Sequence, residues 1–94
     1  MEQTIQDLNL GEIATKIFAE QEAQGKKVSR NHPTAFPYLD AMLDLNTLQD
    51  KYGADSAQSI VLYFLNNAAQ FRGPVIKEAK AELKARLRAN GYKI

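Results

Sequence analysis

The sequence predicts an all-α fold, a small single-domain bundle of four principal helices. Four segments carry apolar residues at the three- and four-residue spacing that gathers side chains on one helix face. Glycine, proline and asparagine stand where these segments begin or end, and no long stretch alternates apolar and polar residues as a strand would. A chain of 94 residues has room for one hydrophobic core. We therefore expect residues 1–94 to form one domain, with a flexible N-terminus over residues 1–8.

The first helix is predicted over residues 10–24. Asn9 and Glu12 have the spacing of a capping box, in which each side chain accepts a hydrogen bond from the other residue's backbone N–H. Gly25 suits the left-handed residue that commonly follows a helix. The segment over residues 24–37 is long and polar, and we expect it to be a loop.

The second helix is predicted over residues 37–45. Pro37 favours a first helical turn, because its ring presets the helical backbone angle and its missing N–H would have no partner there. Polar residues then interrupt the apolar pattern. A short helical turn is expected near residues 47–52, ending at Gly53.

The third helix is predicted over residues 56–71, with Asp55 or Ser56 as its N-cap. It contains no charged residue, which is typical of a helix at the centre of a bundle. The fourth helix is predicted over residues 74–90, because glycine ends one helix and proline begins the next at residues 73–74.

Residues that usually carry catalysis or bind metal ions are scarce. The chain has no cysteine and one histidine, His32, for which a structural role in a turn is expected. Transition metals therefore lack their usual nitrogen and sulfur ligands. Asp40 and Asp44 would share a helix face as a carboxylate pair, although a solvated acidic edge explains them as well. No glycine-rich phosphate loop occurs. We predict no catalytic residues, no cofactor and no metal site, and therefore no enzyme.

Neither export nor membrane insertion is predicted. The N-terminus is acidic and lacks the basic start and apolar run of a secretory signal. The longest apolar cluster, residues 60–65, has six members. A bilayer requires roughly 20 consecutive apolar residues. We expect a cytoplasmic protein that contacts no membrane.

Basic residues gather in the second half of the chain. Residues 1–47 carry four basic and seven acidic side chains, and residues 48–94 carry eight basic and four acidic ones, for a net charge of +1. Four cations form one stripe on the last predicted helix, and three more lie in the predicted loop. The candidate phosphate contacts are Lys77, Lys80, Lys84 and Arg88, extended by Lys26, Lys27 and Arg30. A solvated helix face whose cations suit the helix dipole explains the same stripe.

The third predicted helix carries an arc of uncharged polar residues beside its apolar face. Interface centres are poor in charge and rich in tyrosine, so this arc is a candidate surface for protein contact. Its members are Ser59, Tyr63, Asn66, Asn67 and Gln70. Burial against the first helix would explain the same composition, and the sequence leaves both interpretations open.

These observations favour a small non-enzymatic helical module that acts by contact with a macromolecular partner, most often a protein. Regulators, inhibitors and adaptors, including some encoded by phages or other mobile elements, have this character. Self-association into a homo-oligomer is one form that such contact takes. The alternative is a nucleic-acid-associated protein that uses the basic stripe of the C-terminal helix.

Overall fold

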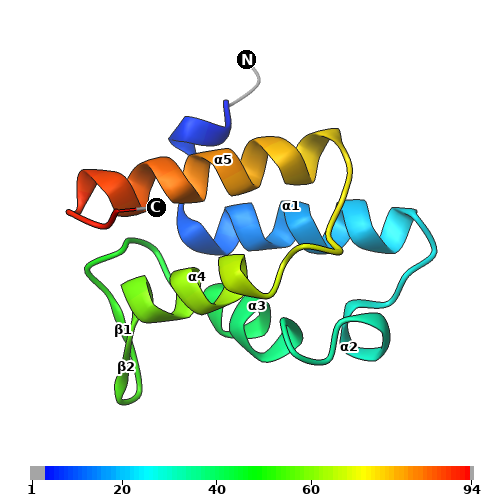
Figure 1. Ribbon diagram of the computed structural model, residues 1–94, viewed down its shortest axis with the longest axis horizontal. Coiled ribbons are helices and arrows are strands. Elements are labelled where there is room, and N and C mark those ends of the chain that lie inside the picture. Colours follow the sequence, from blue (N-terminus) through cyan, green and yellow to red (C-terminus); the bar gives the residue numbers. More distant parts are fainter. Residues whose placement is uncertain (1–3, 94) are drawn as a thin grey trace.

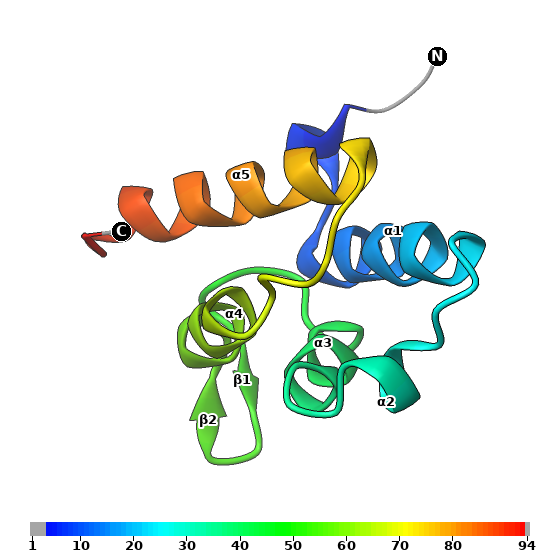
Figure 2. The same ribbon diagram turned by 45° about the vertical axis from the view of Figure 1, so that its right-hand side comes forward.

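The all-α prediction is confirmed within residues 4–93, which the computed structural model describes. Helix α1 (Leu10–Ala23) lies between α5 (Pro74–Ala89) on one side and α3 (Phe36–Met42) on the other (Figures 1 and 2). Helix α4 (Ala57–Asn66) packs against α3 and also contacts α5. The four longer helices thus surround one core, to which α1 contributes from the middle.

The core side chains are the ones that helical spacing gathers on single faces. Ile76, Ala79, Leu83 and Leu87 of α5 have no exposed surface, which confirms the apolar stripe of the last helix. Phe64 of α4 is also fully buried, and burial of one such side chain is worth about 1.5–3 kcal/mol. The core therefore follows the apolar periodicity of the chain.

The capping signals of α1 are confirmed. The backbone N–H of Glu12 donates to the Asn9 side chain at 2.7 Å, and the N–H of Asn9 donates to the Glu12 carboxylate at 2.9 Å. Gly25 has a positive φ of 78°, a conformation that glycine adopts without steric cost. The helix itself ends at Ala23, one residue before the predicted end.

Helix α3 begins beside Pro37 as predicted but ends at Met42, not at residue 45. Residues after α3 instead supply hydrogen-bond acceptors to α1. The N–H groups of Leu10 and Gly11 donate to the carbonyls of Asn46 and Leu45, at 3.0 and 2.8 Å. The first N–H groups of a helix have no partner within it, and a neighbouring turn satisfies them here.

The segment predicted as a loop contains a short helix, α2 (Val28–Asn31). Val28 is fully buried, so this single turn places one apolar side chain in the core between polar flanks. The predicted loop is therefore wrong at these four positions. One buried valine in a polar segment produces no periodic signal, which is why the sequence pattern did not indicate a helix there.

The helical turn predicted over residues 47–52 is replaced in part by a hairpin of β1 (Lys51–Tyr52) and β2 (Asp55–Ser56), which pair antiparallel. Gly53, with φ of 61°, lies in the connecting turn. Before the hairpin, the N–H groups of Asn46 and Thr47 donate to the Asp50 carboxylate at 2.7 and 3.2 Å, which lowers the pKa of Asp50.

Ser56 is the N-cap of α4, because its hydroxyl accepts from the N–H of Ser59 at 3.1 Å. The helix ends at Asn66, so the predicted end at residue 71 is wrong. The Asn67 side chain donates to the carbonyl of Tyr63 at 2.8 Å and competes with a further helical turn. Residues 68–71 instead form a turn, and the carbonyls of Ala68 and Phe71 accept hydrogen bonds from Lys80 of α5.

The N-terminal segment is bound to α5 by Arg86. A short 3₁₀ helix, η1 (Ile5–Asp7), buries Ile5, and Leu8 beside it is buried as well. The guanidinium Nη2 of Arg86 donates to the carbonyls of Ile5 and Leu8 at 3.3 and 2.7 Å, and Nε pairs with Glu82 at 2.6 Å. Residues 5–8 thus have regular structure and contacts with α5, the flexibility expected over residues 1–8 stays a prediction, and residues 1–3 lie outside the described residues.

Candidate anion-binding groove

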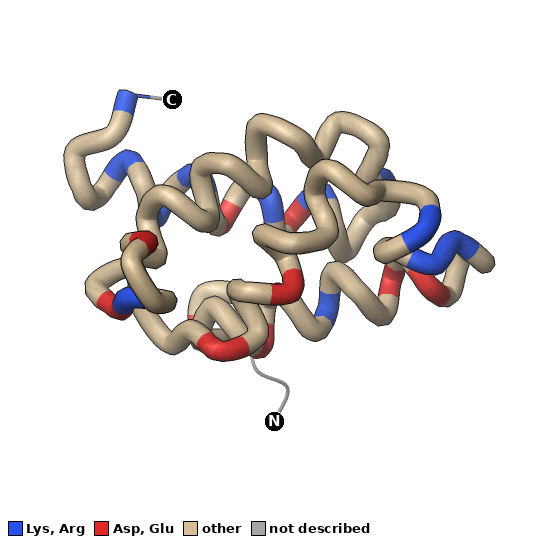
Figure 3. The backbone as a smooth tube through the Cα atoms, turned by 90° about the horizontal axis from the view of Figure 1, so that it is seen from below, with Lys and Arg blue, Asp and Glu red and all other residues tan. Residues whose placement is uncertain are grey.

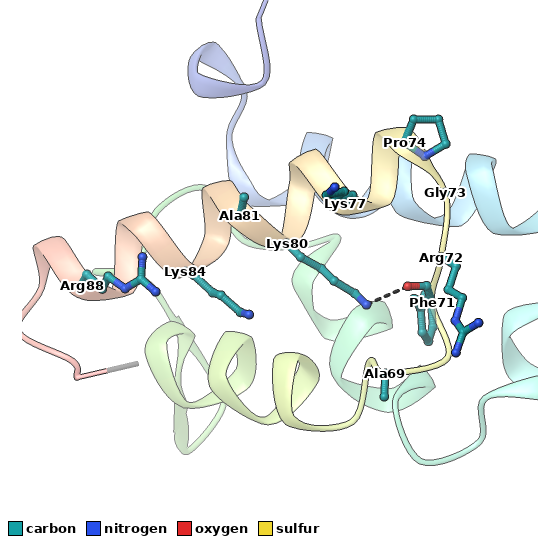
Figure 4. Close-up of a pocket in the computed structure, with 10 residues that line it drawn as sticks. All are labelled: Ala69, Phe71, Arg72, Gly73, Pro74, Lys77, Lys80, Ala81, Lys84 and Arg88. Atoms are coloured by element: carbon teal, nitrogen blue, oxygen red, sulfur yellow. Dashed lines mark hydrogen bonds between the residues drawn. The ribbon is translucent and has the colours of Figure 1, made fainter.

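An open groove of about 590 Å³ runs along α5 and faces the connection between α4 and α5 (Figure 4). Helix α5 forms one wall, and residues 69–73 of the connection form the other. We call this feature the α5 groove. It is lined by Ala69, Phe71, Arg72, Gly73, Pro74, Lys77, Lys80, Ala81, Lys84 and Arg88.

The groove brings together the four cations that the sequence placed on one stripe of the last helix. Lys77, Lys84 and Arg88 are exposed, and Lys80 is half-buried. A rise of about 1.5 Å per residue spreads residues 77–88 over about 16 Å along the helix axis. The stripe is therefore a row of charges along an open groove.

Arg72 is a fifth cation of the groove and does not belong to the predicted stripe. It lies in the connection rather than on α5, so helical spacing could not associate it with the other four. Its carbonyl accepts from the Gln24 side chain at 2.6 Å, which ties the connection to α1. The only sequence signal near it is the helix break at residues 73–74.

Gly73 lets the connection pass close to α1. Its φ is 134°, and a Cβ at this position would overlap the carboxylate of Glu20 and approach the Gln24 side chain to 2.9 Å. The backbone angle favours glycine, whereas the two side chains could rotate away from a Cβ. Gly73 thereby fixes where Arg72 and the start of α5 lie.

Lys80 joins α5 to the turn that follows α4. Its ammonium Nζ donates to the carbonyl of Ala68 and, at 2.7 Å, to the carbonyl of Phe71, as Figure 4 shows for the latter. Burial, followed by the charges of Lys84 and Arg72, lowers the pKa of Lys80. Three cations of the groove are thus close enough to act on one another electrostatically.

Within residues 4–93, no acidic side chain lines the α5 groove. Within residues 4–93, the one ion pair joins Arg86 to Glu82, and neither residue lines the groove. The charge separation along the sequence does not divide the molecule into two charged halves, because both signs occur over the length of the backbone in Figure 3.

The basic residues of the predicted loop do not line the α5 groove. Lys26 and Lys27 are exposed between α1 and α2, and Arg30 is exposed on α2 itself. Lys27 lies beside a separate shallow depression with Glu22. The charge of Lys26 acts instead on His32, whose pKa is lowered by burial and then by this lysine. The structure thus separates these three candidates from the four on α5.

The residues of the predicted uncharged arc lie at the surface rather than under α1, and because α4 ends at Asn66 only the first three belong to that helix while Asn67 caps it and Gln70 lies in the following turn. Tyr63 is 48% exposed, and its ring packs against that of Tyr38 with centroids 5.4 Å apart. Ser59 is half-buried, and its hydroxyl lies 2.9 Å from that of Ser56. The three amide residues of the arc are exposed: Asn66, Asn67 and Gln70. Of the two interpretations left open above, burial inside the bundle does not hold.

The fold and the groove define a small all-α protein with a cationic groove on its C-terminal helix. No protein-family model, curated protein or solved structure matches the chain. Among residues 4–93 there is no group of three or more histidine, aspartate or glutamate side chains placed to hold a metal ion. No helix within that range has the length and apolar character needed to span a membrane.

Proposed function

We propose that this protein is a non-enzymatic binding module whose α5 groove binds an acidic segment of a partner protein. The observation that carries the proposal is that Arg72, Lys77, Lys80 and Lys84 line the groove and that no carboxylate of residues 4–93 lines it. Cations that face one another across open space repel, and an acidic ligand relieves that repulsion. A partner that brings carboxylates into the groove is therefore favoured over a neutral one.

The lining between the cations suits a polypeptide. Ala69, Ala81 and Pro74 present small or apolar surface, so a chain can approach α5 closely while its acidic side chains reach the flanking ammonium groups. Each hydrogen bond between charged groups contributes about 1.5–3 kcal/mol. Two or three such contacts, discounted for screening by salt at an open site, give a weak to moderate affinity.

A second candidate is non-specific contact with nucleic acid, which the linear row of four cations on α5 supports. Among residues 4–93 the groove offers no platform for bases, because the one aromatic residue of that range in its lining, Phe71, is 1% exposed. A partner protein therefore remains the primary proposal, and nucleic acid would contact the groove only through its phosphates.

A fluorescein-labelled peptide of alternating glutamate and alanine tests the proposal by fluorescence anisotropy. The variant Arg72→Ala/Lys77→Ala/Lys84→Ala removes three groove cations and is expected to weaken binding by tenfold or more. The matched control Lys16→Ala/Lys27→Ala/Lys51→Ala removes the same charge from exposed positions outside the groove and should bind like the parent protein.

Equal loss in both triple variants would show attraction to net charge alone and would contradict a specific groove. Absence of binding to the parent protein at low salt would contradict the proposal as well. Labelled single-stranded and duplex DNA are measured in parallel. Tighter binding of either one, with affinity that falls steeply with salt, would promote the second candidate.

A further inference from the structure

The end of α3 and the turn after it present two carboxylates and one exposed apolar side chain. Asp40 and Asp44 are exposed, and Leu43 between them is 40% exposed. The backbone keeps helical angles at Leu43, so the three side chains have the spacing of neighbours on one helix face. No lysine or arginine occurs between Arg30 and Lys51 in the sequence. We call Asp40, Leu43 and Asp44 the α3 edge.

The α3 edge is complementary to the α5 groove in charge and in apolar surface. Lys77 and Lys84 are exposed in the groove, and Ala81 lies between them along α5. Within residues 4–93, neither these lysines nor the carboxylates of the α3 edge form an ion pair. Carboxylates that approach the groove cations would bring the leucine of the edge toward the small apolar lining, where its exposed surface would leave water.

The groove and the edge of one molecule do not meet, because α1 lies between α3 and α5 (Figures 1 and 2). Both surfaces therefore stay open to another molecule. The charge of the chain also favours a second copy as that molecule. Apart from the five cations that line the groove, the sequence carries seven basic and eleven acidic side chains, so the rest of the protein is net acidic.

We propose that the α5 groove binds the α3 edge of a second copy of this chain, so that the molecules associate head to tail. This inference rests on the proposed function and names the partner as the protein itself. The two docking surfaces differ, so a pair of molecules leaves one groove and one edge open, and association continues until a ring closes or the ends stay unfilled. The contact joins exposed charges, so added salt weakens it.

Sedimentation velocity over a range of protein concentrations tests the inference. At low salt the average sedimentation coefficient of the parent protein should rise with concentration, and it should return to the monomer value when salt is added. Two double variants should each weaken self-association by tenfold or more: the groove variant Lys77→Gln/Lys84→Gln and the edge variant Asp40→Asn/Asp44→Asn. Lys80 is left unchanged, because its substitution would also disturb the turn over residues 68–71.

Each double variant has a control that removes the same charge from exposed positions outside both surfaces. The controls are Lys27→Gln/Lys51→Gln and Glu22→Gln/Asp55→Asn, and both should associate like the parent protein.

A mixture of the groove variant and the edge variant gives the sharpest result. The groove variant keeps its edge and the edge variant keeps its groove, so one molecule of each can form one intact contact and no more. The mixture should therefore form a 1:1 dimer, whereas each variant alone stays monomeric. Formation of that dimer also shows that both variants are folded. Circular dichroism melts verify the folding of the controls.

The glutamate–alanine peptide separates the inference from the proposed function. It should dissociate the assembled parent protein, because peptide and edge occupy the same groove. A parent protein that binds the peptide but stays monomeric at about 1 mM and low salt would overturn the inference and leave the proposed function intact. Absence of both peptide binding and self-association would overturn both. Self-association that survives either double variant, or that the charge-matched controls lose equally, would overturn the inference, because the contact would then not join groove and edge.

Discussion

Gly11 is the residue at which helix propensity and tertiary packing predict opposite effects of one substitution. It lies inside α1, where alanine is about 1 kcal/mol more favourable than glycine by propensity. A Cβ at this position would stand 2.6 Å from the carbonyl oxygen of Leu43 and 3.3 Å from that of Leu45. Both neighbours are backbone atoms, which cannot rotate away as a side chain can.

The magnitude follows from the contacts that would have to shift. The backbone near Leu43 would need to retreat by about 0.8 Å to reach the 3.4 Å of ordinary contact. That movement strains the hydrogen bonds from the N–H groups of Leu10 and Gly11 to residues 45 and 46, each worth about 1 kcal/mol. With an overpacking cost of about 1–3 kcal/mol and the propensity gain set against it, Gly11→Ala should lower the free energy of unfolding by about 1–3 kcal/mol.

Thermal unfolding followed by circular dichroism measures this effect, since a loss of 1 kcal/mol lowers the Tm of a domain of this size by roughly 4–8 °C. Ala19→Gly, at an exposed position of the same helix, is the control that isolates propensity and should cost about 1 kcal/mol. A higher Tm for Gly11→Ala than for the parent protein would refute the close approach of α1 to the turn after α3.

Three further predictions concern the core, the surface of α4 and pH. Phe64→Ala should cost about 3–5 kcal/mol in urea unfolding, because Phe64 is fully buried against Phe71 at a centroid distance of 5.4 Å; melting like the parent protein would contradict the orientation of α4. Tyr63→Ala should cost only about 1 kcal/mol, since the ring is 48% exposed, and should weaken partner binding or self-association if the arc is an interface. If Tyr63→Ala lowered stability as much as a core substitution does, or left binding and sedimentation unchanged, Tyr63 would not be an interface residue. Burial lowers the pKa of His32, so as the pH falls below the ordinary histidine pKa of 6.5 the unfolded chain binds a proton at a higher pH than the folded protein does. Stability should therefore fall as the pH drops below about 6.5. His32→Gln should flatten that dependence in thermal melts across pH. A parent protein whose Tm is flat over that range would contradict the prediction.

The ring of His32 lies against a buried amide. Nε2 of His32 is 2.7 Å from the Gln21 side-chain amide, a hydrogen bond whose donor depends on the ring tautomer. Gln21 is fully buried, and the His32 ring packs against Phe71 at a centroid distance of 4.2 Å. The sequence indicated only a structural role in a turn for His32. No local pattern identifies Gln21, eleven residues earlier, as its hydrogen-bond partner.

Features that depend on nearby residues could be predicted from the sequence. The capping box of Asn9 and Glu12, the glycine after α1 and the buried stripe of α5 all involve residues within one or two helical turns of one another. The four cations of α5 belong to the same class, because a helix of known register places them on one face. Periodicity and capping chemistry act locally, so the sequence determined them by itself.

Features that depend on a distant partner were decided only by the tertiary structure. In the turn that follows α4, the carbonyls of Ala68 and Phe71 accept hydrogen bonds from Lys80, which lies twelve residues beyond Ala68. The same packing places Arg72 opposite α5 and completes the groove. Buried backbone carbonyls must find donors, but which donor reaches them depends on how helices pack, and that information is absent from any local pattern.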